Sequence, residues 1–310
     1  MDNMLKLASS PHIHSGKSTS GIMLDVLIAL TPAVVAGALI FGVHSLLVLA
    51  VCVLSAVIFE ALFNLIVKKD QTIGDLSAAV TGLLLGLNLP ATVPLWQCVI
   101  GSAFAILIVK SIFGGIGNNL VNPAITARVF MLVSFSSSMA KQAFPKGVDA
   151  VSSATPLAEI AADKTPALRD LFLGTTGGAI GETCAVALLI GFVYLLVRRV
   201  ISWHIPVSVV GTVFALSFCI HGFDAMTALS LVLSGGLLLG AIFMATDYVT
   251  SPATAWGKVI FGLGIGALTV LIREFGSYPE GVSFAILFMN ILTPYIEQWT
   301  AHRVFGGKKA

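Results

Sequence analysis

Charged residues are scarce in this chain, and their scarcity excludes most classes of soluble protein. Only 10% of the 310 residues are Asp, Glu, Lys or Arg, whereas 57% are hydrophobic and the mean hydropathy is +0.98. An average soluble domain carries roughly 25% charged residues. The net charge of +2 offers no basic surface for nucleic acid, so we expect no nucleic-acid partner. The composition predicts an integral membrane protein.

Metal-ligating residues are also few and scattered. None of the four cysteines belongs to a C-x-x-C pair and each lies in an apolar run, so we expect them to serve packing: Cys52, Cys98, Cys184 and Cys219. The four histidines expected to lie near water form no ligand cluster either: His12, His14, His204 and His221. We therefore predict no metal site. The first 21 residues lack the pattern of a cleaved signal peptide, so the first apolar run is expected to be retained.

Long apolar runs dominate the rest of the chain. A helix that crosses a bilayer needs about 20 apolar residues, and only helices satisfy their backbone internally over such lengths. We expect about ten transmembrane helices, in two groups of five: 22–42, 45–67, 77–94, 95–113 and 118–137, then 180–198, 203–221, 227–246, 255–273 and 281–300. The predicted fold class is all-α.

The basic residues predict the orientation of these helices, because Lys and Arg favour cytoplasmic loops. With a cytoplasmic N-terminus, Arg273 is the only basic residue in the short opposite loops. The cytoplasmic ends then hold Lys6, Lys17, Lys68, Lys69, Lys110, Arg198, Arg199, Lys258, Arg303, Lys308 and Lys309. The sequence therefore predicts a cytoplasmic segment 1–21, an extracytoplasmic connector 138–179 and a cytoplasmic tail 301–310.

An internal repeat is faintly visible between 22–137 and 180–300. Gly82-Leu-Leu-Leu-Gly86 recurs as Gly236-Leu-Leu-Leu-Gly240, and Asp25 and Glu182 each stand near the start of a group. An odd number of crossings inserts the second copy upside down, which predicts two inverted five-helix repeats with sites near the midplane. Residues 77–90 would form only about 21 Å of helix before Pro90, against a core of about 30 Å, so this segment is expected to face protein or a cavity.

The longest polar stretch contains Ser152-Ser-Ala-Thr155-Pro-Leu157. Thr is a favoured N-cap and Pro156 suits the first helical position, so a simple helix cap explains these residues. A phosphoryl group esterified to the Thr155 hydroxyl would face the free N–H groups of the same helix start. Cap and phosphate attachment are compatible interpretations.

A second polar string, Gly114-Gly-Ile-Gly-Asn-Asn119-Leu-Val-Asn122, leads into a helix that carries Arg128. Unsatisfied polar groups are costly at membrane depth, so these amides need partners. They could bond neighbouring helices, or they could bind a planar heterocycle edged with carbonyls and ring nitrogens. Arg128 could pair with an acid on another helix, or it could neutralise flavin or phosphate charge.

Several strings together resemble the family of D subunits of the Rnf complex. They cover most of the chain: Ser10-Pro-His-Ile-His14, Asp25 to Pro32, Gly117-Asn-Asn-Leu-Val-Asn-Pro-Ala124, Ser152 to Leu157, Gly181-Glu-Thr183 and Phe243 to Pro252. The related B subunits of the sodium-pumping NADH:quinone reductase carry a longer N-terminal extension. One position departs from the pattern, because the family usually has Gly where this chain has Ser153.

The resemblance implies a multi-pass flavoprotein of the cell (inner) membrane with both termini in the cytoplasm. Such a protein relays electrons between ferredoxin and NAD in coupling to Na⁺ or H⁺ translocation, and is not catalytic alone. FMN would be bound covalently at Thr155, within the Ser152–Ser153 motif, by a flavin transferase. Asn119 and Asn122 match positions that contact a second, non-covalent flavin, riboflavin. The implied partners are subunits A, B, C, E and G of the complex.

Other interpretations stay open at this point. A quinone reductase subunit would share the flavin but need a quinone site, and an inverted-repeat permease or channel would need no flavin. Four acids at or within the spans could couple ion movement or serve as ordinary helix-end groups: Asp25, Glu60, Glu182 and Asp247.

Overall fold

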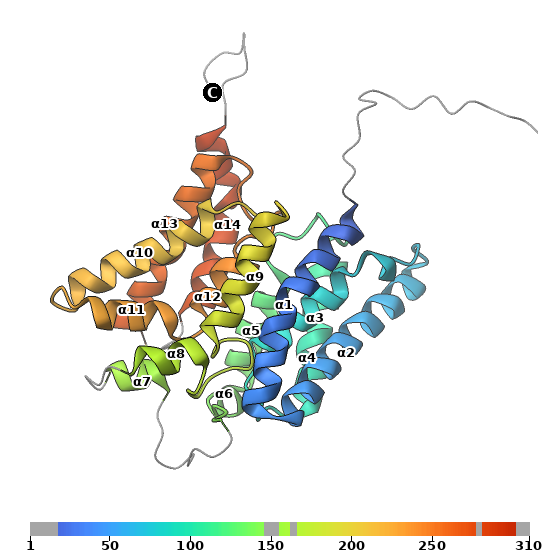
Figure 1. Ribbon diagram of the computed structural model, residues 1–310. Helices are drawn as coiled ribbons and strands as arrows, with labels where there is room; N and C mark the ends of the chain where they lie inside the picture. Colours follow the sequence, from blue (N-terminus) through green and yellow to red (C-terminus); the bar gives the residue numbers. More distant parts are fainter. Residues whose placement is uncertain (1–17, 146–154, 162–165, 277–280, 302–310) are drawn as a thin grey trace, which may run out of the picture.

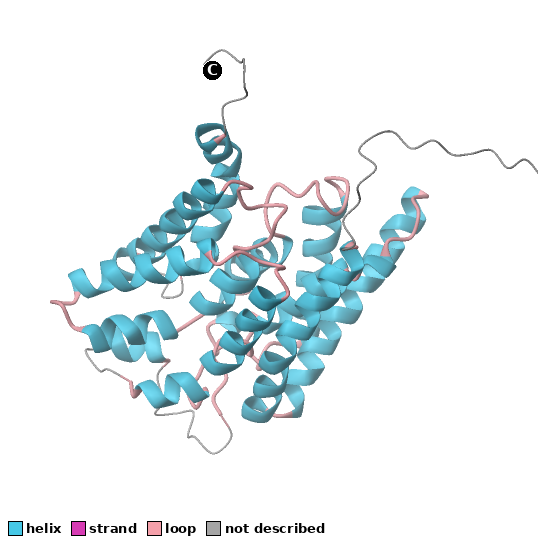
Figure 2. Cartoon of the chain, turned by 45° about the horizontal axis from the view of Figure 1, so that its top comes forward, coloured by secondary structure: helices cyan, strands magenta, loops and turns pink. Residues whose placement is uncertain are grey.

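The computed structural model describes residues 18–145, 155–161, 166–276 and 281–301. These residues form helices joined by loops, and the described ranges contain no strand beyond an isolated bridge between Ala143 and Gly178 (Figure 2). The prediction of an all-α membrane protein is confirmed. The predicted division of the chain into segments remains a prediction.

The first group of helices follows the predicted order with different ends. It comprises α1 (Thr19–Phe41), α2 (Val43–Val67), α3 (Ser77–Leu87), α4 (Leu95–Ala103) with the π-helical η2 (Phe104–Ser111), and α5 (Pro123–Ser134). The predicted run 77–94 stops at Leu87, before Pro90, and the run 118–137 begins only at Pro123, because Asn122 is the N-cap of α5.

Three short helices connect the two groups: α6 (Ser136–Met139), α7 (Pro156–Ala161) and α8 (Leu168–Leu173). The second group then comprises α9 (Ala185–Val197), α10 (His204–Ile220), α11 (Ala225–Leu233), α12 (Leu237–Leu239) with the π-helical η3 (Gly240–Met244), α13 (Ala255–Phe275) and α14 (Val282–Thr300). The predicted run 227–246 is broken, since α11 and the α12–η3 segment meet at an angle of 63°.

Membrane-crossing length is reached by fewer helices than the ten predicted runs. Among the described residues, α1, α2 and α13 are long and apolar enough to cross alone, and α11 with the α12–η3 segment meets the same criterion only as a pair. The helices α3, α5, α9 and α10 are apolar but shorter. Ten crossings therefore stay a prediction.

The two groups lie side by side and meet along α1 and α9 (Figure 1). The start of α1 and the end of α14 lie at one edge of the molecule, and α6, α7 and α8 lie at the opposite edge. This arrangement has the sidedness expected for an odd number of crossings before the connector.

Helix packing is similar within the two groups, but the glycines of the repeated Gly-Leu-Leu-Leu-Gly string have different surroundings. Helix α2 packs against α3 and α4, as α10 packs against α11 and α13. A Cβ at Gly82 would come within 2.6 Å of the Cys52 carbonyl oxygen in α2, so this glycine permits close helix packing. Gly236 instead faces the side chains of Glu182 and Arg128. The inverted repeat stays a prediction.

Candidate functional site

Thr155 is the N-cap of α7 and lines a pocket. Its hydroxyl accepts a hydrogen bond from the Ala158 backbone N–H at 3.4 Å, and Pro156 takes the first helical position, as predicted. The pocket lies between α7, α8, the end of α11 and the segment before α9. Ser152 and Ser153 lie outside the described residues.

Two residues that line this pocket carry unused hydrogen-bonding atoms. They are Gln142 and Thr183, whose side-chain carbonyl oxygen and hydroxyl, respectively, are buried without a hydrogen-bond partner among the described residues. A buried polar atom without a partner costs about 1–3 kcal/mol. A ligand with polar edges would satisfy both atoms, and the ring system of a flavin carries such edges.

Backbone contacts position Thr183 and its neighbour Glu182. The N–H groups of Ile180 and Gly181 donate to the carbonyls of Leu89 and Leu87 at 3.1 and 2.8 Å, at the end of α3. A Cβ at Gly181 would come within 2.7 Å of the Leu87 Cβ, which explains the glycine in the Gly181-Glu-Thr string. The segment before α9 is therefore anchored on the short third helix of the other group.

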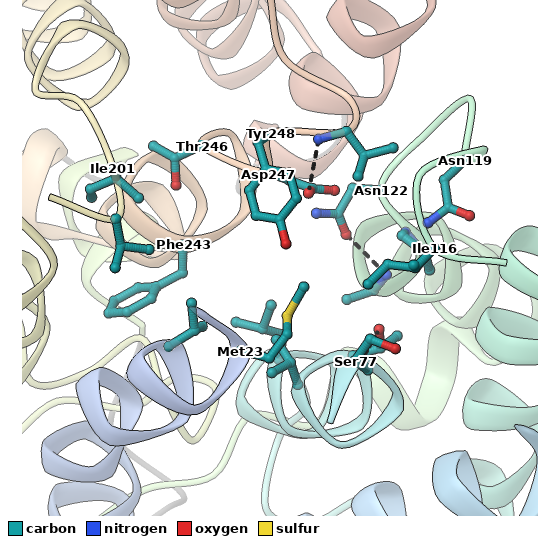
Figure 3. Close-up of a pocket in the computed structure, with 18 of the residues that line it drawn as sticks. Met23, Ser77, Ile116, Asn119, Asn122, Ile201, Phe243, Thr246, Asp247 and Tyr248 are labelled. Atoms are coloured by element: carbon teal, nitrogen blue, oxygen red, sulfur yellow. Dashed lines mark hydrogen bonds between the residues drawn. The ribbon is translucent and has the colours of Figure 1, made fainter. Parts of the chain in front are cut away.

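A second and larger pocket lies at the opposite end of α9 (Figure 3). It is formed by the start of α1, α3, the start of α5, the end of α9 and the segment after η3. Figure 3 shows Phe243 and Ile201 on one side of the opening, with Asn119 and Ile116 on the other. Apolar walls with a few polar groups are typical of cofactor pockets.

The two asparagines predicted to bind riboflavin both line this second pocket but differ in their bonding. The side-chain carbonyl oxygen of Asn122 accepts hydrogen bonds from the backbone N–H groups of Ala124 and Ile125 at 3.0 and 3.3 Å. Its side-chain NH₂ group donates to the backbone carbonyl oxygen of Met244 at 3.2 Å. Asn122 thus serves helix capping and packing. The carbonyl oxygen of Asn119 is buried without a hydrogen-bond partner in the described part of the chain, so Asn119 is the better ligand candidate.

Three other residues of this pocket were not predicted as binding residues: Lys110, Phe243 and Tyr248. The Phe243 to Pro252 string was a signal for two of them, since it places aromatic rings and Asp247 at the end of a span. Asp247 accepts from the Val249 N–H at 3.3 Å and from the Thr250 hydroxyl at 3.4 Å. Burial raises the pKa of Asp247, and these two hydrogen bonds oppose the rise.

Arg128 pairs with an acid, as one of the two interpretations predicted. Its guanidinium lies 2.7 Å from the Glu182 carboxylate, both side chains are buried, and a second guanidinium nitrogen donates to the Asn88 carbonyl oxygen. Glu182 precedes α9 rather than lying within a helix. Arg128 does not line either pocket, whereas Glu182 lines the Thr155 pocket.

Two further acids are held in ion pairs. Glu60 lies 2.6 Å from the ammonium group of Lys110, which also donates to the Ser77 hydroxyl at 2.5 Å. Asp25 in α1 pairs with Arg198, just after α9, at 3.2 Å. The acids near the start of each group, Asp25 and Glu182, therefore both pair with an arginine of the other group, which braces the two groups together.

Comparison with known proteins agrees with this architecture. A model of the NQR2, RnfD, RnfE family matches residues 6–306. The chain is 46% identical to the D subunit of the Na(+)-translocating ferredoxin:NAD(+) oxidoreductase complex of Acetobacterium woodii, over 98% of this chain and 96% of that protein. It is 41% identical to the D subunit of the proton-translocating ferredoxin:NAD(+) oxidoreductase complex of Clostridium ljungdahlii, over 99% and 98%. It is 35% identical to the D subunit of the ion-translocating oxidoreductase complex of Erwinia tasmaniensis, over 98% and 99%. The chain belongs to the NQR2, RnfD, RnfE family.

Proposed function

We propose that this chain is a flavin-bearing D subunit of an Rnf-type ion-translocating ferredoxin:NAD oxidoreductase complex. It relays electrons between neighbouring subunits and is not catalytic alone. The names and near full-length similarity of its relatives support this assignment. Its partners are subunits A, B, C, E and G, with a flavin transferase for maturation.

The chain is a multi-pass membrane protein, and we place it in the cytoplasmic (inner) membrane with both ends of the chain in the cytoplasm. The distribution of Lys and Arg supports this orientation. The position of α7 at the edge opposite the start of α1 and the end of α14 also supports it (Figure 1). Thr155 then faces the extracytoplasmic side.

The observation that carries the flavin proposal is the pocket beside Thr155. A threonine in the Ser-Ser-Ala-Thr-Pro-Leu motif lines a cavity in which the buried Gln142 and Thr183 oxygens lack partners among the described residues. The Thr155 hydroxyl would carry the FMN phosphate as an ester, and Gln142 and Thr183 would bond the polar edge of the ring. When bound, the flavin supplies reversible acceptance of electrons.

The second pocket would hold non-covalent riboflavin. Asn119 offers a buried side-chain carbonyl oxygen for the polar edge of the ring, and Phe243 and Tyr248 offer aromatic surface. Asn122 would contribute by fixing the start of α5 against Met244. The two flavins would then lie at opposite ends of α9.

In-gel fluorescence after SDS denaturation tests the covalent attachment. The complex, produced together with a flavin transferase, should show a fluorescent band for this chain, and Thr155→Ala should abolish it. Among the described residues Thr155 makes one side-chain hydrogen bond, to a six-residue helix, so the variant should still insert. Thr176→Ala is a matched control, because Thr176 lines the same pocket and should leave fluorescence intact. Undiminished fluorescence in Thr155→Ala would refute the assignment.

A B-like subunit of a sodium-pumping NADH:quinone reductase is the second candidate, because the family model that matches this chain also covers NQR2. It would share the flavin and add quinone reduction. NADH oxidation by the purified complex with quinone, compared with ferredoxin as the partner, separates the two functions.

A further inference from the structure

A continuous buried polar network connects the two pockets. Glu182 lines the Thr155 pocket and pairs with Arg128. Arg128 in turn donates a hydrogen bond to the side-chain carbonyl oxygen of Asn88. The Asn88 amide contacts the Met244 sulfur at 3.3 Å, and the Met244 carbonyl oxygen accepts from Asn122 at 3.2 Å, on the second pocket. The network therefore spans the molecule between the two ends of α9.

The formal charges of this network lie at one end. Arg128 and Glu182 are charged, whereas Asn88, Met244 and Asn122 contribute only dipoles. The guanidinium of an arginine stays protonated in proteins, so the positive charge of Arg128 is permanent. Within a buried, low-dielectric region charges act over longer distances than in water. The Thr155 pocket therefore lies near a positive charge that the adjacent Glu182 carboxylate offsets.

The surroundings hold this pair rigidly. A Cβ at Gly236 would come within 2.6 Å of the Glu182 carboxylate and 3.0 Å of the Arg128 guanidinium, so the helix break between α11 and α12 packs its backbone directly on the pair. The Asn88 carbonyl oxygen fixes the other side of the guanidinium. A pair held in this way keeps its charges at fixed positions relative to the pocket.

We propose that the Arg128–Glu182 pair sets the reduction potential of the flavin attached at Thr155, with Glu182 shielding that flavin from the charge of Arg128. This inference rests on the proposed function. Reduction adds electrons to the flavin, so a more positive surrounding favours the reduced form. Removal of the Glu182 charge should therefore raise the midpoint potential. Removal of both charges should bring it back, because the double variant is again neutral.

The test uses the full-length chain, produced with the flavin transferase and purified in detergent. Redox titration followed by visible absorbance is performed on the wild type and variants, and the Thr155→Ala chain supplies the spectrum without covalent flavin for subtraction. Glu182→Gln should shift the covalent flavin to a more positive midpoint. Arg128→Gln/Glu182→Gln should return most of that shift, and Glu182→Asp, which keeps the charge, should stay near the wild type.

A merely structural pair would give a different pattern. It would lower flavin loading or thermal stability in the variants without moving the midpoint of the flavin that remains bound. An unchanged or lower midpoint in Glu182→Gln, or a double variant shifted as far as the single one, would overturn the inference. Absence of covalent fluorescence in the wild type would instead refute the proposed function, so the two failures are distinguishable.

Discussion

Gly236 lies directly against the carboxylate of Glu182, since a Cβ at position 236 would come within 2.6 Å of the Glu182 oxygen. This contact joins the break between α11 and α12 to a buried ion pair. A side chain at this position would have to displace either the backbone or the charges.

Gly236→Ala should therefore destabilise the protein by about 1–3 kcal/mol, the usual cost of forcing extra atoms into a packed site. Thermal unfolding in detergent measures the effect. Gly211→Ala is the matched control, because Gly211 lies within α10 and no atom would meet its Cβ within 4 Å. The control should unfold at the wild-type temperature or slightly above it. Equal stability of the two variants would contradict the packing described for Gly236.

The buried pair of Glu60 and Lys110 supplies a second prediction. Lys110→Met leaves the Glu60 carboxylate buried without its cation, which should lower the free energy of unfolding by about 3–5 kcal/mol. The double variant Glu60→Gln/Lys110→Met should recover part of this loss, because no unpaired charge remains. Chemical or thermal unfolding of the three proteins gives the comparison. A double variant no more stable than Lys110→Met would show that packing, rather than charge, dominates at this site.

Asn119 and Asn122 should respond differently to replacement by leucine. Asn119→Leu should weaken binding of the non-covalent flavin by about tenfold, since a lost buried hydrogen bond costs about 1–3 kcal/mol. Asn122→Leu removes the N-cap of α5 and the bond to Met244, so it should also lower protein stability, by about 1 kcal/mol for the cap alone. Extracted riboflavin and thermal unfolding measure the two effects. Normal riboflavin content in Asn119→Leu would return this residue to a packing role.

Asp224, the N-cap of α11, should make the stability of the fold depend on pH. The Thr227 hydroxyl, followed by the Met226 N–H, lowers the pKa of Asp224 by donating to its carboxylate. A pKa lower in the folded than in the unfolded state stabilises the fold above the unfolded value of about 3.9, and this stability is lost as the pH falls through the folded value. Wild-type unfolding temperatures should therefore drop more steeply in acid than those of Asp224→Asn, which keeps an N-cap oxygen. Parallel curves would exclude this role.

The sequence alone was sufficient for the all-α class and for some local features. Scarce charge and long apolar runs require helices, because only helices satisfy their own backbone in lipid. The cap at Thr155 is a local interaction within four residues, so the string Thr155-Pro156 predicts it directly. The sequence also predicted that Arg128 needs a negative partner, either an acid or a flavin or phosphate group, since a buried guanidinium cannot lose its charge.

Only the tertiary structure decided which residues meet. Glu182 lies 54 positions from Arg128, and Met244 lies 122 positions from Asn122, so no local pattern identifies these partners. The structure also distinguished the roles of Asn119 and Asn122, two amides of one string. The side chain of Asn122 caps α5 and bonds Met244, whereas the side-chain carbonyl oxygen of Asn119 has no partner among the described residues. The break between α11 and α12 is likewise tertiary: a leucine-rich run predicts continuous helix, but Gly235 at positive φ turns the chain and Gly236 packs on the Arg128–Glu182 pair. The apolar pattern of the sequence indicates which side chains of each helix are buried, whereas the long-range contacts decide which of them are buried together.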